Sequence, residues 1–451
     1  MIQCFKIKIN KFLILGVFLF ALFGFVHAAQ AATYYVATNG SDANTGTLSQ
    51  PFRTLQKAAD IVNPGDTVIV RDGVYGAGGK QYPFILSRPG TPTNWITFKA
   101  ENKWKAVLDG EGAAYNTVEF RPNAAYIRIE NFEIKNAYYS GIAIDSDRCP
   151  GCHDIYIKGN IIHDIGNRDT SESGGITGIE QGVGIHHTTY EDNLFYSIGR
   201  NPAADPYHNH DHGIYAYGDD ITIINNVFRQ HKAGWGIQLA PGANNVKILN
   251  NTFIDPNPYI DGQIILWGNH ANITIKNNIF YLPNTDAIAL YPYDGSGNTN
   301  VVIQNNLIYG VTNILPSGTT GGQFITPNNI IGNDPKFVNA SAGNFRLQSN
   351  SPAINAGATL GSPYNVDFDG ILRPQGSAYD IGAYEYVSGG TPTPPPAGGS
   401  ADLNSDGRVN SVDAAILMGA WGQTSKPKAD INQDGVVNSV DASLMMGQWT
   451  P

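Results

Sequence analysis

The chain has little cysteine, few charged side chains and few long apolar runs, and each scarcity excludes a class of protein. Three cysteines in 451 residues are too few for a disulfide-rich scaffold. The formal net charge of -10 disfavours nucleic acid or an anionic membrane as a partner. Beyond residue 26 no run is apolar for long enough to cross a bilayer. We therefore expect no membrane span in the mature chain.

The exception is the amino terminus, which has the three-part pattern of a secretory signal peptide. Lys6, Lys8 and Lys11 precede an apolar run that ends near Val26. Small residues follow around Ala31, as a signal-peptide cleavage site requires. Residues 1–32 are therefore predicted to be removed, which makes the net charge about -13. We expect a secreted protein, either extracellular or attached to a cell surface.

Two cysteines remain after the signal peptide, as the motif CPGC. Cys149 and Cys152 flank a Pro-Gly pair that favours a tight turn. In an exported chain this spacing favours a small disulfide loop that braces the local backbone. A redox centre and half of a zinc site are the alternatives.

Internal repeats are the strongest large-scale signal. An apolar strand followed by asparagine and another apolar residue recurs seven times, every 25 to 33 residues, at Asn131, Asn160, Asn193, Asn226, Asn251, Asn278 and Asn306. A constant kernel with variable spacing predicts one coil per repeat, with loops of different length inserted at a corner. Stacked coils would pair their strands in parallel, and each asparagine amide could bond to the next coil. A β-sandwich is the alternative, but its Asn-Gly hairpin tips are nearly absent.

This pattern resembles the right-handed parallel β-helix of the pectate-lyase-like proteins, over residues 33–386. The opening segment YYVATNGSDANTGTLSQPFRTLQKAADIVNPGDTVIVRDGVY and the closing SPAINAGA, DFDG and DIGAYEY belong to the resemblance. It implies an all-β solenoid, expected to be monomeric, in an exported protein of sugar-acting or adhesive function. Within the opening segment, an apolar face of helical spacing can cover the open end of the first coil, at Leu55, Ala58, Ala59 and Val62.

A short linker and a small second domain are expected after the solenoid. Residues 387–400 are rich in Pro, Gly and Thr, which predicts an extended spacer. Residues 401–451 then repeat one loop twice, as DLNSDGRVNSVD and DINQDGVVNSVD. Each repeat places oxygen side chains at loop positions 1, 3, 5, 9 and 12 and glycine at position 6, as a calcium loop requires. An apolar helix is expected after each loop.

The duplicated loop and helix resemble the type I dockerin domain. The resemblance implies two Ca²⁺ ions and docking to a cohesin on a scaffold or cell-surface protein. Met418-Gly419 and Met446-Gly447 stand where cellulosomal dockerins often carry Lys-Arg, so a purely structural calcium module is an alternative. The implied ligands are Asp402, Asn404, Asp406, Arg408 (carbonyl), Asn410 and Asp413 in the first loop, and Asp430, Asn432, Asp434, Val436 (carbonyl), Asn438 and Asp441 in the second.

A candidate groove follows from aligning the glycine-containing strands of the solenoid. The segments SGIAID, VGIHHT, HGIYAY, WGIQLA and DGQIIL are predicted to lie in one column of successive coils. Because strand side chains alternate, the outward positions are predicted to be Ala143, His186, Tyr215, Gln238 and Ile264. We expect the glycines beside them to give a ligand access to the backbone.

Loops rich in histidine border this column. They contribute His208, His210, Asp211, His231 and Lys232. A catalytic metal and ordinary solvated loop residues are both open readings of the histidines, although His208 and His212 would lie about 13 Å apart in an extended strand.

The leading hypothesis is a polysaccharide lyase that cleaves a uronate-containing glycan by β-elimination. This reaction needs a donor for the carboxylate, a base for the C5 proton and an acid for the leaving oxygen. We assign Gln238 with Lys232 to the carboxylate, His186 or His210 to the base and Tyr215 to the acid, with His208 as a further catalytic candidate. Substrate contacts are expected from Tyr217, Trp235, Trp267 and Asp211, with Tyr291 and Tyr293 as further platforms.

Two alternatives remain open. A glycoside hydrolase would place two carboxylates about 6 to 10 Å apart in the groove, and the acidic residues close in sequence are Asp205, Asp211, Asp219 and Asp220. A non-catalytic glycan-binding or adhesive solenoid would bring no such groups together. The groove residues therefore distinguish the three functions.

Overall fold

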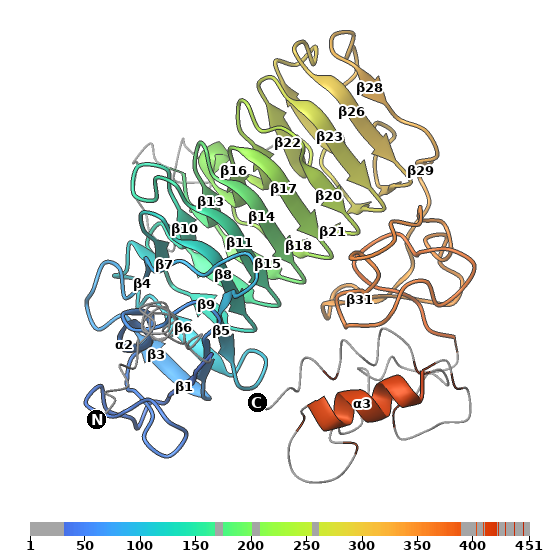
Figure 1. The fold of residues 1–451 in the computed structure, drawn as a ribbon. Helices are drawn as coiled ribbons and strands as arrows, with labels where there is room; N and C mark the ends of the chain where they lie inside the picture. The colour runs from blue at the N-terminus through green and yellow to red at the C-terminus, as the bar shows by residue number, and fades with distance from the viewer. Residues whose placement is uncertain are drawn as a thin grey trace, which may run out of the picture.

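The computed structural model describes residues 31–166, 175–200, 208–254 and 261–388, and in the C-terminal segment residues 403, 409, 411–421, 423, 429, 437 and 445. The chain winds as a parallel β-helix with three sheets, seen from the side in Figure 1. The predicted signal peptide up to residue 30 and the linker from residue 389 lie outside the described residues.

Each complete coil contributes one strand to each of three parallel sheets, which we call the first, second and third sheet in coil order. The first sheet contains β1 (Thr33–Val36), β2 (Thr67–Val70), β5 (Ile96–Ala100), β8 (Ala125–Glu130), β11 (His153–Lys158), β14 (His186–Glu191), β17 (Asp219–Ile224), β20 (Lys247–Leu249), β23 (Ala271–Lys276), β26 (Thr299–Gln304) and β28 (Phe324–Ile325). The second sheet contains β3 (Gly73–Gly76), β6 (Ala106–Asp109), β9 (Glu133–Lys135), β12 (Ile161–Ile165), β15 (Leu194–Ile198), β18 (Val227–Arg229), β21 (Thr252–Ile254), β24 (Ile279–Tyr281), β27 (Leu307–Tyr309) and β29 (Ile330–Ile331). The third sheet contains β4 (Phe84–Leu86), β7 (Asn116–Phe120), β10 (Ser140–Ile144), β13 (Thr177–Gln181), β16 (His212–Ala216), β19 (Trp235–Leu239), β22 (Ile264–Trp267) and β25 (Ile288–Tyr291).

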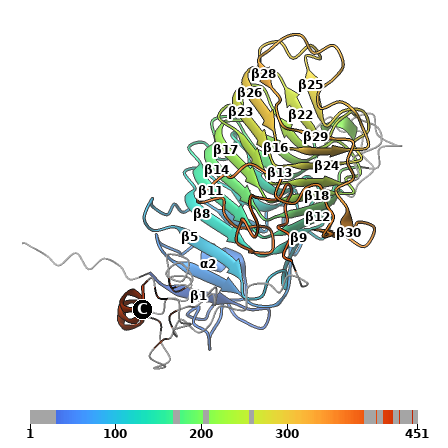
Figure 2. The same cartoon turned by 90° about the vertical axis from the view of Figure 1, so that its right-hand side faces the viewer.

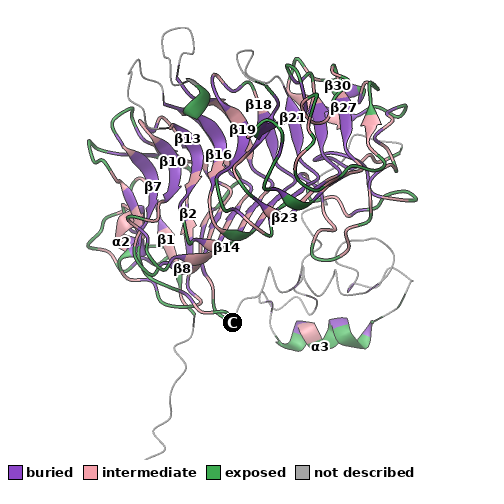
Figure 3. Ribbon diagram, turned by 90° about the horizontal axis from the view of Figure 1, so that it is seen from above, coloured by how far each residue is buried: buried purple, intermediate pink, exposed green. Residues whose placement is uncertain are grey.

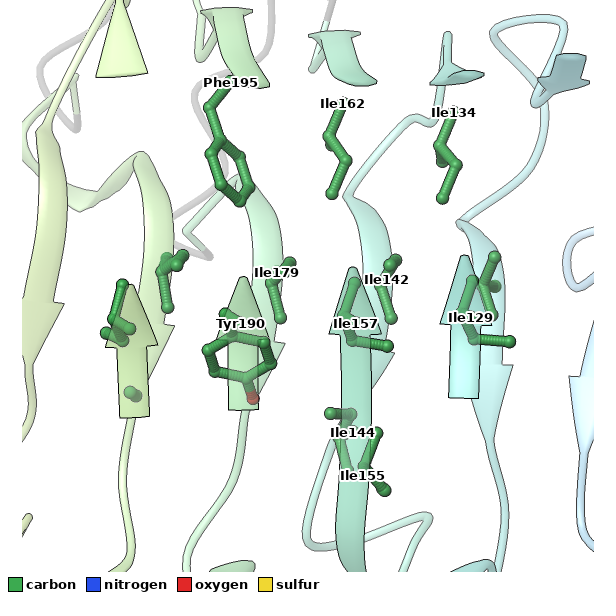
Figure 4. Close-up of a cluster of buried hydrophobic side chains, with 14 of the residues drawn as sticks. Ile129, Ile134, Ile142, Ile144, Ile155, Ile157, Ile162, Ile179, Tyr190 and Phe195 are labelled. Atoms are coloured by element: carbon green, nitrogen blue, oxygen red, sulfur yellow. The ribbon is translucent and has the colours of Figure 1, made fainter. Parts of the chain in front are cut away.

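The core fills the space between the three sheets. Alternate side chains of each strand point inward and stack on the equivalent residue of the next coil. Figure 4 shows such a stack, with Ile129 and Ile157 from the first sheet facing Ile142 and Ile179 from the third. Figure 3 shows that buried residues run through the strands of the whole solenoid. Stacking of equal side chains thus extends one core along the helix axis.

The predicted asparagine ladder lies at the corner between the first and second sheets. The Oδ1 atom of Asn226 accepts hydrogen bonds from the backbone N–H of Asn193 at 2.9 Å and from its Nδ2 at 3.1 Å. The same contacts recur in the following coils. Oδ1 of Asn251 accepts from the N–H and Nδ2 of Asn226, and Oδ1 of Asn278 accepts from the N–H and Nδ2 of Asn251. Each amide therefore satisfies buried backbone groups of the neighbouring coil.

Asn131 does not belong to this ladder, so its predicted register was wrong by one residue. Phe132 occupies the ladder position in that coil, where its N–H donates to Asn160. Asn131 instead has φ 67 and occupies the position that Gly159 (φ 69) takes one coil later. Asparagine tolerates this left-handed conformation, and adjacent asparagines in the later repeats made the two positions indistinguishable from sequence.

One end and one outer face of the solenoid are covered by other segments. The short helix α2 (Leu55–Ala59) begins at Thr54, whose side chain accepts from the N–H of Lys57, and buries Leu55, Ala58 and Ala59 as predicted. The hairpin of β30 (Phe337–Asn339) and β31 (Asn344–Leu347) packs on the outside of the second sheet, against Val227, Ile254 and Ile279. Figure 2 shows β30 beside that sheet. The second sheet is therefore covered on its outer side by a later segment of the chain.

No helix among the described residues has the length and apolar character needed to span a membrane.

Candidate functional site on the third sheet

The outward column of the third sheet contains two glutamates next to a tyrosine and a glutamine. In the strand register Glu119 (β7) pairs with Ala143 (β10), Ala143 with Glu180 (β13), and Glu180 with Tyr215 (β16). Tyr215 pairs in turn with Gln238 of β19, so the predicted neighbours Tyr215 and Gln238 are adjacent. The column continues to Ile265, whereas Ile264, which was expected to point outward, lies in the core.

The predicted place of His186 in this column was wrong. His186 begins β14 of the first sheet, where it pairs with His153 and Asp219. Its ring stacks on that of His153, with centroids 5.4 Å apart. The Gly-Ile pair at positions 178–179 belongs to the third sheet, while the similar pair at 184–185 lies in the turn that follows it. Glu180 therefore occupies the position that was assigned to His186.

The glycines of these strands serve packing between coils rather than ligand access. A Cβ atom on Gly178 would lie 2.6 Å from the carbonyl oxygen of Gly213, and one on Gly213 would lie 2.5 Å from that of Gly236. Both would also press on phenylalanine rings of the core. Only glycine allows so close an approach of neighbouring strands.

A polar network joins the two glutamates on the sheet surface. Asn116 donates from Nδ2 to Glu119, and its Oδ1 accepts from the N–H of Ser140 at 3.2 Å. The hydroxyl of Ser140 donates to Glu180 at 3.2 Å and lies 2.8 Å from the hydroxyl of Thr177. The carboxyl groups are thus held on one surface across β7, β10 and β13.

Two arginines cover Glu119. Its Oε1 lies 3.4 Å from Nη2 of Arg121 and 3.5 Å from Nη1 of Arg148, and its side chain is fully buried. The guanidinium of Arg148 also lies over the rings of Tyr82 and Tyr115, at 5.2 and 5.1 Å from the centroids. Burial raises the pKa of Glu119, and the Asn116 amide and both arginines oppose the shift.

The turn that carries Arg148 is closed by the predicted disulfide. Cys149 and Cys152 are bonded and buried. The N–H groups of Arg148 and Cys149 both donate to the carbonyl of Asp145, at 3.0 and 2.7 Å. This turn therefore holds Asp145 and Arg148 beside the sheet surface.

Glu180 has the electrostatic environment of an acid–base group. Burial and then the negative charge of Asp145 raise its pKa to about 7, against the opposing effects of Ser140 and Arg148. Its side chain is still partly exposed, so a bound molecule can reach the carboxyl group. A carboxyl group with this pKa can give or take a proton at neutral pH.

Tyr215 lies beside Glu180 with its phenol held as a donor. Its hydroxyl donates to that of Tyr217 at 2.9 Å, and burial raises its pKa above the ordinary value. Its ring stacks on His212, which in turn stacks on Trp235, with centroids 5.3 and 5.7 Å apart. Burial keeps the pKa of His212 well below its usual range, so this histidine is neutral and acts in packing.

Asp211 and Lys232, which were predicted to border the site, have other partners in the structure. His210 is exposed, and nothing is described for the side chain of His208. Asp211 was assigned to substrate, but it is fully buried and pairs with Arg200 at 2.6 Å. Lys232 follows β18, and its charge lowers the pKa of Asp164 in the second sheet. No cluster of metal-binding side chains occurs within the described residues.

In the C-terminal segment the described part of the first loop fits a closed calcium loop. Helix α3 (Ser411–Gly419) follows it, and Asp413 is buried and accepts from the N–H of Leu403 at 2.7 Å. Position 12 of the loop therefore reaches back to position 2. The remaining predicted ligands lie outside the described residues, at Asp402, Asn404, Asp406, Arg408, Asn410, Asp430, Asn432, Asp434, Val436, Asn438 and Asp441.

Sequence reasoning missed Glu119, Asp145, Arg148 and Glu180. A usable signal was present, since the segment TGIEQ contains the same Gly-Ile kernel as HGIYA and WGIQL. Alignment on this segment would have placed glutamate before Tyr215 and Gln238.

Family models match most of the chain in three segments. Residues 34–170 match "Pel9A-like, right handed beta helix region", residues 206–356 match "Right handed beta helix region", and residues 400–448 match "Dockerin type I domain". These matches confirm the predicted β-helix and dockerin. The predicted domain bounds themselves stay predictions.

Individual relatives are distant. The Bacillus subtilis (strain 168) "Uncharacterized protein YwoF" is 26% identical over 60% of this chain and 46% of its own length. "Pectate lyase PEL9" of Emericella nidulans is 30% identical over 19% of this chain and 20% of its own length. The chain thus spans less than half of each curated relative.

Similar solved structures include a pectate lyase and a glycoside hydrolase. "Pectate lyase Pel9A" has 18% identity, a TM-score of 0.47, and coverage of 79% of this chain and 96% of its own. The GH136 lacto-N-biosidase from Eubacterium ramulus has 16% identity, a TM-score of 0.43, and coverage of 67% and 68%.

Proposed function

We propose that this chain, a right-handed parallel β-helix followed by a dockerin type I domain, is a secreted enzyme that cleaves glycosidic bonds of a polysaccharide. The cleavage takes place on the outer face of the third sheet, and Glu180 transfers the proton. The observation that carries the proposal is the partly exposed carboxyl of Glu180, whose pKa is about 7 beside Asp145 and Tyr215.

Hydrolysis is the reaction that the acidic pair favours. Protonated Glu180 gives its proton to the glycosidic oxygen as the bond from that oxygen to the anomeric carbon breaks. Asp145 takes a proton from the water whose oxygen bonds to the same carbon. Asp145 directly follows β10, the strand beside β13, and its charge acts on Glu180. An inverting hydrolase uses two carboxyl groups about 6.5–9.5 Å apart. Glu119 is too deeply buried for the second role.

β-Elimination is the second candidate, and the arrangement of Tyr215 and Arg148 favours it. Glu180 in its ionised form would remove the C5 proton of a uronate, in place of His186 in the original assignment. The phenol of Tyr215 would protonate the leaving oxygen, and Arg148 would bind the uronate carboxylate. The two reactions require opposite protonation states of Glu180.

The C-terminal domain supports a role in attachment. Dockerin type I domains generally bind calcium and imply a cohesin partner. We assign two Ca²⁺ ions to the two loops, with Asp413 as the ligand whose position is described. Each ion would supply the charge that holds its loop closed. The enzyme would then act while fixed to a cohesin-bearing scaffold or cell surface.

The test is incubation of the full mature chain, with calcium, against pectic, alginate, glycosaminoglycan and neutral polysaccharides. Reducing ends and the ultraviolet absorbance of unsaturated uronate are followed together. Reducing ends without absorbance support hydrolysis, and both signals together support elimination. Glu180→Gln should remove either activity, while the matched variant His186→Ala should keep it. Absence of both signals on every substrate contradicts the proposal and favours a binding or adhesive solenoid.

A further inference from the structure

The outer face of the third sheet is chemically different on the two sides of Glu180. From this difference we infer that the substrate is a mixed polysaccharide, in which an acidic sugar binds toward β7 and neutral sugars bind toward β25. The inference rests on the proposed function, since it names the substrate class of that site.

The side toward β7 presents cationic groups. Arg121 and Arg148 each keep 29% of their side chains exposed, while the carboxylate of Glu119 beneath them has none. A ligand on the surface therefore meets the guanidinium groups before it meets the negative charge. A guanidinium group can bind a sugar carboxylate through two parallel hydrogen bonds.

The side toward β25 presents aromatic rings on an apolar floor. Trp267 pairs with Tyr291 in the register of β22 and β25. Tyr291 is 53% exposed and Tyr293 is 70% exposed. In the outward column, Ile265 and Ala289 lie on the same strands as these rings, and Tyr215 and Gln238 lie between them and Glu180. Exposed aromatic rings above small apolar residues suit the apolar faces of neutral sugars.

The charges on this second side disfavour an anion. Asp261 and Asp294 are exposed, and Asp286 lies just before β25. Between Trp235 and Tyr293 the chain has two cationic residues, Lys247 and Lys276, and both lie on strands of the first sheet. Among the described residues of β19, β22 and β25 there is no lysine or arginine, so an acidic sugar bound toward β25 would meet carboxylates.

The dimensions suit an extended chain along the helix axis. The sheet order from Glu180 is β13, β16, β19, β22 and β25. At the inter-strand spacing, Trp267 lies about 14 Å and Tyr291 about 19 Å from Glu180 along the axis. Arg121 lies about 10 Å in the opposite direction. One oligosaccharide can therefore contact both sides while its central bond lies at Glu180.

The test measures binding to the full-length Glu180→Gln chain, so that the ligand is not cleaved during the measurement. Isothermal titration calorimetry compares an oligogalacturonate, a neutral xylo-oligosaccharide and a mixed oligosaccharide that has galacturonate at one end and neutral sugars at the other. We expect the mixed ligand to bind at least about tenfold more tightly than either of the others. Adding Arg148→Gln should weaken both uronate-containing ligands about tenfold and spare the neutral one.

Two further variants locate the neutral side. Trp267→Ala should weaken the neutral and mixed ligands, whereas Trp95→Ala, an aromatic change before β5 of the first sheet, should weaken none. Equal affinity for oligogalacturonate and the mixed ligand, or an equal loss on all ligands with Arg148→Gln, would overturn the inference. Absence of binding by all three would overturn it as well, whereas the proposed function is judged separately from cleavage by the unmodified chain.

Discussion

Asp145 directly follows β10, and Glu180 lies on the neighbouring strand β13 of the third sheet. The charge of Asp145 adds to burial in raising the pKa of Glu180 to about 7. A carboxylate that raises the pKa of its neighbour produces one proton donor and one proton acceptor from two chemically similar groups. This relationship leads to predictions about pH, stability and cleavage.

The pH dependence should show which reaction occurs. If Glu180 acts as the acid of a hydrolase, it must be protonated, and kcat/KM should fall as the pH rises through about 7. If Glu180 is the base of a lyase, kcat/KM should rise through the same pH. A profile that is flat between pH 5 and pH 9, measured on the best substrate, would exclude both roles.

Glu180 in its ionised form should also lower the stability of the folded chain at alkaline pH. Its pKa in the folded chain, about 7, is above the ordinary value of 4.5, so stability is greatest below pH 4.5 and decreases as the pH rises to about 7. Glu180→Gln should therefore raise the Tm at pH 8 and leave it almost unchanged at pH 4, as checked by calorimetry at the two values. An equal change at both pH values would contradict the cited cause.

Arg148, held by the disulfide-closed turn, should lower the pKa of Glu180. Its positive charge lowers the pKa of Glu180, so Arg148→Gln should raise that pKa. The pH at which kcat/KM changes should then shift to a higher value. Replacing Cys149 and Cys152 together with serine should cause a similar upward shift, because the turn would no longer hold Arg148. NMR titration of the Glu180 carboxyl measures both effects without substrate. If the cysteine variant changes only the Tm, the disulfide has no positioning role.

The asparagine ladder should carry much of the stability of the solenoid. Asn226→Ala leaves the N–H groups of Asn193 without their acceptor inside the core and should cost at least about 3 kcal/mol in urea unfolding. Asn329→Ala removes the partly exposed end of the same ladder and should cost less, since water can replace the lost amide. Equal costs would argue against ordered amide stacking.

Calcium should stabilise the C-terminal domain selectively. Adding Ca²⁺ to the full chain after chelation should raise the unfolding temperature of one calorimetric transition and leave that of the β-helix unchanged. Asp413→Ala removes the carboxylate that contacts Leu403 and should lower the apparent calcium affinity. A calcium-independent transition would contradict the assignment of the loops.

The repeat kernel was sufficient to predict the coils and, except at Asn131, the asparagine ladder, because both depend on a local pattern that recurs. The apolar cap at Leu55 was predicted from helical spacing within one segment. The site was predicted only in part, and Tyr215 and Gln238 were found because their strands follow one another without ambiguity. His186 was misplaced because two Gly-Ile pairs lie within one repeat, and only three-dimensional pairing distinguishes the strand from the turn. Arg148 and Asp145 reach the surface through a disulfide-closed turn, whose direction no periodicity encodes.

The most direct test of the account is kcat for Glu180→Gln on the polysaccharide that the unmodified chain cleaves best, measured near the pH optimum. The substitution keeps the size and polarity of the side chain and removes its ability to transfer a proton. We predict a loss of about 10²- to 10⁴-fold in kcat with little change in KM. A variant that retains kcat within a factor of about two would show that Glu180 does not transfer the proton.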